Sequence, residues 1–136
     1  MSSISFAGGG LGGTELVVAQ YVYTAQSLAV DCPFYIADRS VTVLSINLRV
    51  EIAGTDAGAV TCQIRKVASG TAVASGTVLH SGTGNLKGTA ATNQAITLST
   101  TASDLTLPSG TALGFDLTGI STAAVGCVTV VLQAGG

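Results

Sequence analysis

Residues 44–52, LSINLRVEI, alternate without a break between apolar and polar side chains. Successive side chains of a strand point to opposite faces, so this period of two places every apolar member on one face. That face comprises Leu44, Ile46, Leu48, Val50 and Ile52. After the turn-forming sequence AGTDAG, the alternation resumes over residues 60–65. The two runs predict two half-buried strands that pair as an antiparallel hairpin.

Short runs rich in Thr, Val and Leu fill most of the remaining chain, and each is bounded by Gly, Ser, Asn or Pro. They are CPFYIA, GTVLH, QAITLS, DLTL, TALGFDL and GCVTVVLQ. In TALGFDL the expected core face is Leu113, Phe115 and Leu117, with Asp116 outward. This pattern predicts an all-β fold, an antiparallel β-sandwich that is a jelly roll of about 7–8 strands. We expect residues 15–136 to form it as a single domain.

The last run, GCVTVVLQ, is apolar on both of its faces. Val128, Val130 and Leu132 form one face, and Val131 adds an apolar side chain to the other. A strand that is apolar on both sides is usually covered on both sides. We therefore expect a neighbouring sheet or another subunit to cover this strand.

The N-terminal sequence FAGGGLGGTELVV contains the spacing Gly8-x-Gly10-x-x-Gly13, which fits a dinucleotide-binding turn. Such a turn works only between a strand and a helix. The segment that follows, TELVVAQYVYTAQSLAV, is rich in Val, Tyr and Thr, which favour a strand. We therefore interpret the spacing as a coincidence. Residues 1–14 are instead predicted to form a flexible Gly-rich arm that carries Phe6 and Leu11.

Two adjacent copies of a hexapeptide, VASGTA and VASGTV, occupy residues 67–78. A β-solenoid needs at least about three such copies to bury a core. The two copies therefore predict a Gly-turned connection or a weak edge strand.

Charged residues make up 9% of the 136-residue chain, whereas about 25% is usual in soluble proteins. Five scattered Lys and Arg residues face seven Asp and Glu residues, for a net charge of −2. Nucleic-acid binding depends on clustered cations, so the composition argues against it. A weakly charged, apolar surface instead indicates one that a partner or a second copy covers.

No stretch of the chain has the roughly 20 apolar residues that a membrane-spanning helix needs. No basic segment precedes an apolar one at the N-terminus, so no secretory signal is expected. The three cysteines are Cys32, Cys62 and Cys127, an odd number without metal-type spacing. Because they lie in apolar, β-patterned segments, we expect buried, reduced thiols and synthesis in a cytoplasm.

The residues that usually carry chemistry do not form a recognisable site. The single histidine, His80, has no acid close to it in the sequence, and no G-x-S-x-G motif is present. We expect His80 to be a solvated turn residue. Asp56 is the only acid of the AGTDAG turn, too few oxygen ligands for calcium. The sequence thus predicts no catalytic residue, no metal site and no cofactor.

Two stretches carry a resemblance to a known class of protein. They are YIADRSVTVLSINLRVEIAGTDAGAVTCQIRKVASGTAVASGT and NLKGTAATNQAITLSTTASDLTLPSGTALGFDLTG. From about residue 34 to residue 132 the chain resembles capsid decoration, or cement, proteins encoded in the structural gene clusters of tailed phages. The resemblance implies a trimeric jelly roll that sits on the outside of the head and has no active site.

The resemblance further implies a structural virion protein that binds the capsid exterior and stabilises the shell by bridging capsid subunits. Its expected partners are the major capsid protein and its own copies in a homotrimer. The candidate partner-binding residues are Ile4, Phe6, Leu11, Tyr21 and Tyr23. Two alternatives stay open. One is a tail or fibre component, and the other is a carbohydrate-binding module in which Tyr21, Tyr23 and Tyr35 form a stacking platform.

Overall fold

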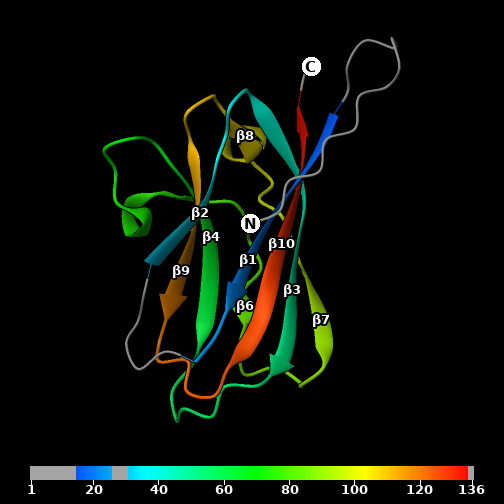
Figure 1. Cartoon of the computed structure of the whole chain (residues 1–136), viewed down its shortest axis with the longest axis vertical. Coiled ribbons are helices and arrows are strands. Elements are labelled where there is room, and N and C mark those ends of the chain that lie inside the picture. The colour runs from blue at the N-terminus through cyan, green and yellow to red at the C-terminus, as the bar shows by residue number, and fades with distance from the viewer. Residues whose placement is uncertain (1–14, 26–30, 135–136) are drawn as a thin grey trace.

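The computed structural model describes residues 15–25 and 31–134. Within these ranges the chain forms two antiparallel sheets that pack face to face (Figure 1). Sheet A has the order β1-β10-β3-β7, and β8 also pairs with β3. Its strands are β1 (Glu15–Tyr23), β3 (Val41–Ile52), β7 (Thr92–Ile96), β8 (Thr106–Leu107) and β10 (Val125–Ala134).

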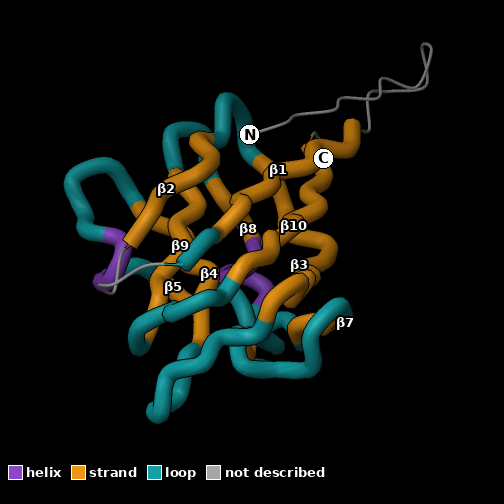
Figure 2. Tube along the Cα trace, turned by 60° about the horizontal axis from the view of Figure 1, so that its bottom comes forward, coloured by secondary structure: helices purple, strands orange, loops and turns teal. Residues whose placement is uncertain are grey.

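Sheet B has the order β2-β9-β4-β5, and β6 also pairs with β4. Its strands are β2 (Asp31–Ile36), β4 (Thr61–Val67), β5 (Thr77–Val78), β6 (Gly84–Asn85) and β9 (Ala112–Thr118). Two short 3-10 helices, η1 (Val73–Ser75) and η2 (Ala102–Leu105), lie in the connections (Figure 2).

The order of the strands is that of a jelly roll. Strands β1 to β4 alternate between sheets A and B, and β9 and β10 alternate again. The short strands β5 and β6 both pair with β4, whereas β7 and β8 both pair with β3. Each sheet therefore has four strand positions, as in an eight-stranded jelly roll. The all-β sandwich predicted from the turn and strand pattern is confirmed.

The predicted hairpin between the two alternating runs is wrong. β3 lies in sheet A and β4 lies in sheet B, so the AGTDAG segment crosses from one sheet to the other. Backbone bonds hold this crossing in place, from Gly54 N–H to Leu86 O (2.9 Å) and from Thr55 N–H to Thr122 O (3.0 Å). Alternation determines which face of a strand is buried but not which strand it pairs with. Both runs bury their apolar faces in the same core from opposite sides.

β3 also departs from the predicted alternation at its two ends. Ile46, Leu48 and Val50 are buried, but Leu44 is 43% exposed and Ile52 is 50% exposed. The pairing of β3 with β10 shifts register at two places, between Ser45 and Val43 and between Ile52 and Val50. Each shift is a β-bulge, and one extra residue transfers the following side chains to the other face. The expectation that all five apolar side chains share the core face is therefore wrong for Leu44 and Ile52.

The core between the sheets contains the inward-facing residues of both. All six core positions predicted in β9 and β10 are buried: Leu113, Phe115, Leu117, Val128, Val130 and Leu132. Cys62 is also buried, and burial raises the pKa of its thiol to about 12. Cys32 and Cys127 are only half-buried free thiols. The prediction of buried cysteines is therefore correct for Cys62 and wrong for the other two.

The hexapeptide repeat forms a Gly-turned connection, as the pattern predicted, and not a solenoid. It leads from the end of β4 through η1 to β5. Val73 of η1 packs on Gly114 of β9, where a Cβ would lie 2.6 Å from the Val73 Cγ1 atom. The repeat thus covers part of the outer surface of sheet B.

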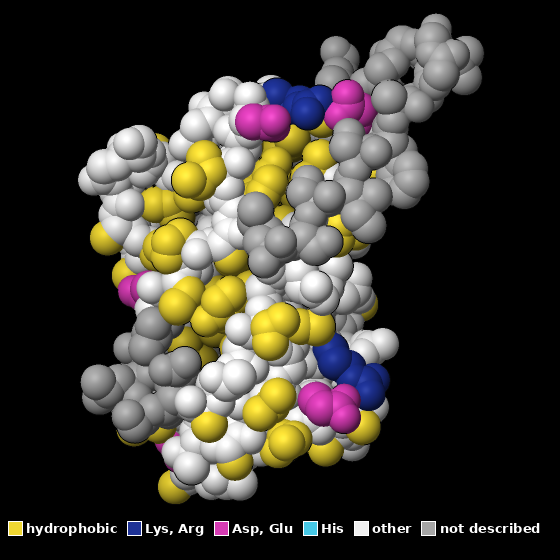
Figure 3. Space-filling view, viewed as in Figure 1, with side chains coloured by type: hydrophobic (Ala, Val, Ile, Leu, Met, Phe, Trp, Pro, Cys, Tyr) yellow, Lys and Arg dark blue, Asp and Glu magenta, His cyan; other side chains and the backbone are white. Residues whose placement is uncertain are grey.

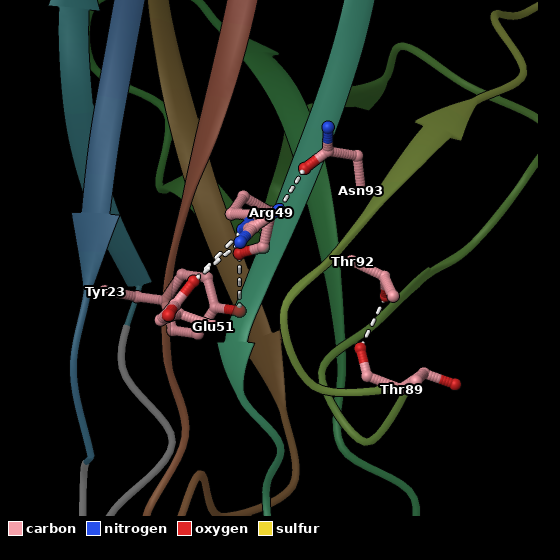
Figure 4. A network of polar contacts seen from close by, with 6 residues as sticks. All are labelled: Tyr23, Arg49, Glu51, Thr89, Thr92 and Asn93. Carbon is pink, nitrogen blue, oxygen red and sulfur yellow. Dashed lines mark hydrogen bonds and ion pairs between the residues drawn. The ribbon is translucent and has the colours of Figure 1, made fainter.

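Tyr23 ties together three neighbouring strands of sheet A. Its side chain reaches from β1 across β10, and its hydroxyl donates a hydrogen bond to the backbone oxygen of Arg49 in β3 (3.2 Å; Figure 4). Gly126 is the residue of β10 that pairs with Tyr23. A Cβ at Gly126 would overlap with both the Arg49 oxygen and the Tyr23 hydroxyl. The close approach of the Tyr23 ring therefore requires glycine at this position.

We expect Gly126→Ala to lower the free energy of unfolding by about 2–3 kcal/mol, because the added Cβ must displace β3 or the Tyr23 ring. Equilibrium unfolding in urea measures the change. The matched control is Gly58→Ala, since a Cβ at Gly58 would have no atom within 4 Å. Equal stability of the two variants would show that Tyr23 does not constrain Gly126.

Candidate interaction surfaces

The described residues do not assemble a site for metal-dependent chemistry. Among them, no group of three or more His, Cys, Asp and Glu side chains is placed to hold a metal ion. The same part of the chain contains no helix that is both long enough and apolar enough to cross a membrane. Residues 15–23, where a dinucleotide site would need a helix, form the strand β1. The glycine spacing at Gly8–Gly13 lies outside the described residues.

His80 is a buried structural residue and not the solvated turn residue that the sequence predicted. Only 7% of its surface is exposed. Its Nε2 accepts a hydrogen bond from the backbone N–H of Ile64 (3.0 Å), and its Nδ1 lies 2.5 Å from the backbone oxygen of Gly82. Nδ1 therefore carries the proton and donates it to Gly82. The ring thus links β4 to the segment that follows β5 by bonding a backbone group on each side. The local sequence could not reveal this role, because Ile64 lies 16 residues away in the chain.

All five cations of the chain are engaged within the molecule. Arg39 pairs with Glu15, Arg49 with Glu51 and Arg65 with Asp116, at 2.5, 2.9 and 2.8 Å. Lys66 donates to the backbone oxygens of Ser103 and Thr106, and Lys87 to those of Asp56 and Gly58. A phosphate ligand would have to displace these contacts. The cations therefore serve the fold, and they are too dispersed to form a patch.

A carboxylate pair lies on the outer surface of sheet B. Asp31 of β2 pairs in register with Asp116 of β9, and Asp116 accepts a hydrogen bond from Arg65 Nε (2.8 Å). Burial and the adjacent Asp116 carboxyl raise the pKa of Asp31. Arg65 also donates to Gln63 and to the backbone oxygen of Gly76. The group thus joins β2, β9, β4 and the repeat connection, which gives it a structural role.

The tyrosines do not form an exposed stacking platform. Tyr23 is 3% exposed and Tyr35 is 7% exposed, whereas Tyr21 is half-buried. The Tyr21 ring packs against Phe115 and Phe34, with ring centroids 4.8 and 5.7 Å apart. Burial raises the pKa of Tyr21 to about 12. These rings close the gap between β1 and β2, which is a role in the core.

Of the five candidate partner-binding residues, the structure describes two. Tyr21 keeps some exposed surface beside β2, and Tyr23 has almost none. Ile4, Phe6 and Leu11, together with the predicted arm of residues 1–14, lie outside the described residues.

The outer face of sheet A is a weakly charged surface. By strand register it includes Leu16, Val18, Gln20, Val22, Ser45, Asn47, Arg49, Ile52, Val125, Cys127, Thr129, Val131 and Gln133. Leu16 is 38% exposed and Val22 is 63% exposed, and Arg49 is already paired with Glu51. In the view of Figure 3, hydrophobic side chains are scattered over both sheets, and the charged groups gather mainly near the top and at the lower right. Such a surface favours contact with another protein.

No protein-family model and no curated protein sequence matches this chain. The structure is similar to a chain of the cyanophage Pam1 capsid asymmetric unit, with a TM-score of 0.54 and 17% sequence identity. The similarity covers 98% of this chain and 92% of that chain. At this level of identity it concerns the fold, and it extends over nearly the whole length of both chains.

We expect the free energy of unfolding to fall as the pH is lowered through about 6.5, the ordinary pKa of histidine. Burial lowers the pKa of His80 in the folded protein. The unfolded chain therefore binds a proton at a higher pH than the folded chain, and protonation favours unfolding. Protonation of Nε2 would also break its hydrogen bond, because the new N–H would face the N–H of Ile64 and neither group can accept. Urea unfolding at several pH values between about 7.5 and 5.5 measures the dependence.

The comparison for this experiment is His80→Gln, which removes the titrating ring. The variant should be less stable at neutral pH by about 1–3 kcal/mol, because the Ile64 N–H loses its partner. Its stability should vary less with pH than that of the parent protein over this range. Parallel pH profiles for the two proteins would contradict the role given to His80.

Proposed function

We propose that this chain is a structural protein of a tailed-phage virion, a head decoration or cement protein that binds the outside of the capsid shell. It acts as a homotrimer, and each trimer bridges neighbouring subunits of the major capsid protein. The observation that supports this most directly is the similarity in fold, over 98% of the chain, to a chain of the cyanophage Pam1 capsid asymmetric unit.

The surface chemistry supports the same proposal independently. A protein that binds nucleic acid or a charged substrate offers free cations or acids to it. Here the cations are held in ion pairs or bonded to backbone oxygens, and Leu16, Val22, Leu44 and Ile52 are apolar and exposed in sheet A. Apolar surface of this kind is stabilised when another protein covers it.

The mechanism requires no catalytic residue. A protein that binds the assembled shell but not its dissociated subunits stabilises the shell by mass action, and the effect grows with the concentration of the bound protein. Buried area between the decoration protein and two adjacent subunits supplies the free energy. His80 and the Asp31–Asp116 pair, the groups most similar to catalytic ones, are both explained by contacts within the fold.

The carbohydrate-binding alternative loses its main support. Sugar stacking requires exposed aromatic faces, whereas Tyr23 and Tyr35 are buried and Tyr21 packs against Phe34 and Phe115. A tail or fibre position would use the same surfaces as a head position. The location of the protein in the virion separates these two.

We expect the protein to copurify with intact virions in a fixed ratio to the major capsid protein, and to remain with heads after the tails are removed. Quantitative mass spectrometry of whole virions and of separated heads and tails measures this. Recovery with tails alone would establish the tail alternative, and absence from virions would contradict the proposal as a whole.

We expect the purified chain to be trimeric, because a weakly charged outer face is covered when copies associate. Light scattering coupled to size-exclusion chromatography gives the mass directly. A monomer at about 100 μM, where interfaces of ordinary size are occupied, would contradict the trimer and leave the virion location to be judged separately.

A further inference from the structure

The two sheets end in four edges, and the described strands differ in how these edges are protected. An edge strand exposes unpaired backbone N–H and C=O groups, which natural proteins protect by Pro, Lys, bulges or short length. β2 contains Pro33, which has no N–H, and its register shifts at Phe34. β5, β6 and β8 have two residues each, and β7 has five.

β1 has none of these protections. It has nine residues, ELVVAQYVY, without Pro, Lys or Arg. It pairs with β10 in an unbroken register from Glu15–Ala134 to Tyr23–Gly126. Among the described residues, the backbone of residues 16–23 pairs with β10 alone. Every second residue of an antiparallel edge strand directs its N–H and C=O away from its partner, so β1 presents a row of groups that another strand could bond.

Apolar surface lies beside this edge. Val22 is 63% exposed and Leu16 is 38% exposed on the outer side of β1. On the inner side, Tyr21 contacts Phe34 of β2. A hollow of about 400 Å³ lies against the β2 residues Pro33, Phe34, Tyr35 and Ile36. A strand added to β1 would cover these side chains, and the hollow could receive one of its own.

We propose that the free edge of β1 binds an extended, uncharged segment of a capsid subunit, which adds to sheet A as a further strand. The inference rests on the proposed function and names the part of the surface through which it acts. Main-chain bonds supply the affinity in this mode of recognition, and alternate side chains supply the specificity. Residues 16–23 carry no charge, so the segment that matches them is uncharged as well.

A capsid segment fits this edge better than a second copy of β1 does. Two identical strands that pair antiparallel form a two-fold contact, in which the same surface is used on both sides. A homotrimer has no such contact. In the proposed trimer β1 therefore does not pair with the β1 of another copy, and a different segment has to supply the added strand.

Hydrogen exchange tests the proposal on the full-length protein, free and bound to empty shells of the major capsid protein. Backbone amides that gain a strand partner exchange more slowly. We expect exchange in the peptide that covers residues 16–23 to slow by about tenfold or more on binding. Exchange in β7, the opposite edge of sheet A, should not change.

A pair of lysine variants separates the β1 edge from an edge of the other sheet. Val22→Lys places a charge on the edge strand of sheet A, as natural proteins do to prevent strand addition. Thr77→Lys places the same charge at an exposed position of β5, an edge strand of sheet B. Both positions are exposed, so both variants should fold with nearly unchanged melting temperatures. We expect Val22→Lys to weaken binding to the shells by about tenfold or more, and Thr77→Lys to leave it nearly unchanged.

The outcomes distinguish the inference from the function on which it rests. Binding to shells with unchanged exchange in residues 16–23, or equal loss of binding in both lysine variants, would overturn the β1 site and leave the decoration role intact. Slow exchange at the edge in the free protein, together with a dimeric mass, would show that a second copy occupies the edge and would also overturn the proposal. No binding of the parent protein to shells would overturn both.

Discussion

The pairing of β10 between β1 and β3 is the interaction on which sheet A depends. β10 is the last strand of the chain, yet it joins the first strand to the third along most of their lengths. Such pairings between distant parts of the chain form late and slowly, because loop closure precedes the contacts that stabilise it. Tyr23 and Gly126 reinforce the same three strands through the hydrogen bond to Arg49. Among the described residues, the backbone of residues 16–23 pairs with β10 alone.

The few charged residues stabilise the fold more than they define its surface. Arg65 joins Asp116 to the repeat connection, and Lys66 joins the end of β4 to the backbone around η2. His80 likewise bonds the backbone on two sides. Buried polar groups that have all their partners specify one arrangement of strands. The exposed surface that remains consists mainly of small polar and apolar side chains, which suits association with other proteins.

Association through such a surface has a physical advantage in a shell. A capsid presents the same binding site many times. Weak apolar contacts that are repeated at every copy of this site stabilise the shell, although no single contact is strong. An edge strand adds directed backbone bonds to these contacts. In the proposed strand addition, these main-chain bonds supply affinity and alternate side chains supply specificity.

The sequence by itself determined the fold class and much of the core. Period-two alternation identified the inward-facing residues of β9 and β10, and the mixture of Val, Tyr and Thr after the glycines identified β1 as a strand. Low charge predicted a surface that a partner covers, which stays a prediction. The conclusions about the strands depend only on residues that are close in the sequence, because the pleat of a strand makes successive side chains alternate between its two faces.

Only the tertiary structure decided which strands pair and which surfaces stay open. β3 and β4 have the pattern of a hairpin but belong to opposite sheets, and two bulges expose Leu44 and Ile52. His80 is buried because segments distant in the sequence surround it. The position of β1 at the end of sheet A could not be predicted either, since any strand can be central or peripheral. Strand partners are chosen by the packing of the whole sandwich, and that choice leaves no local pattern in the sequence.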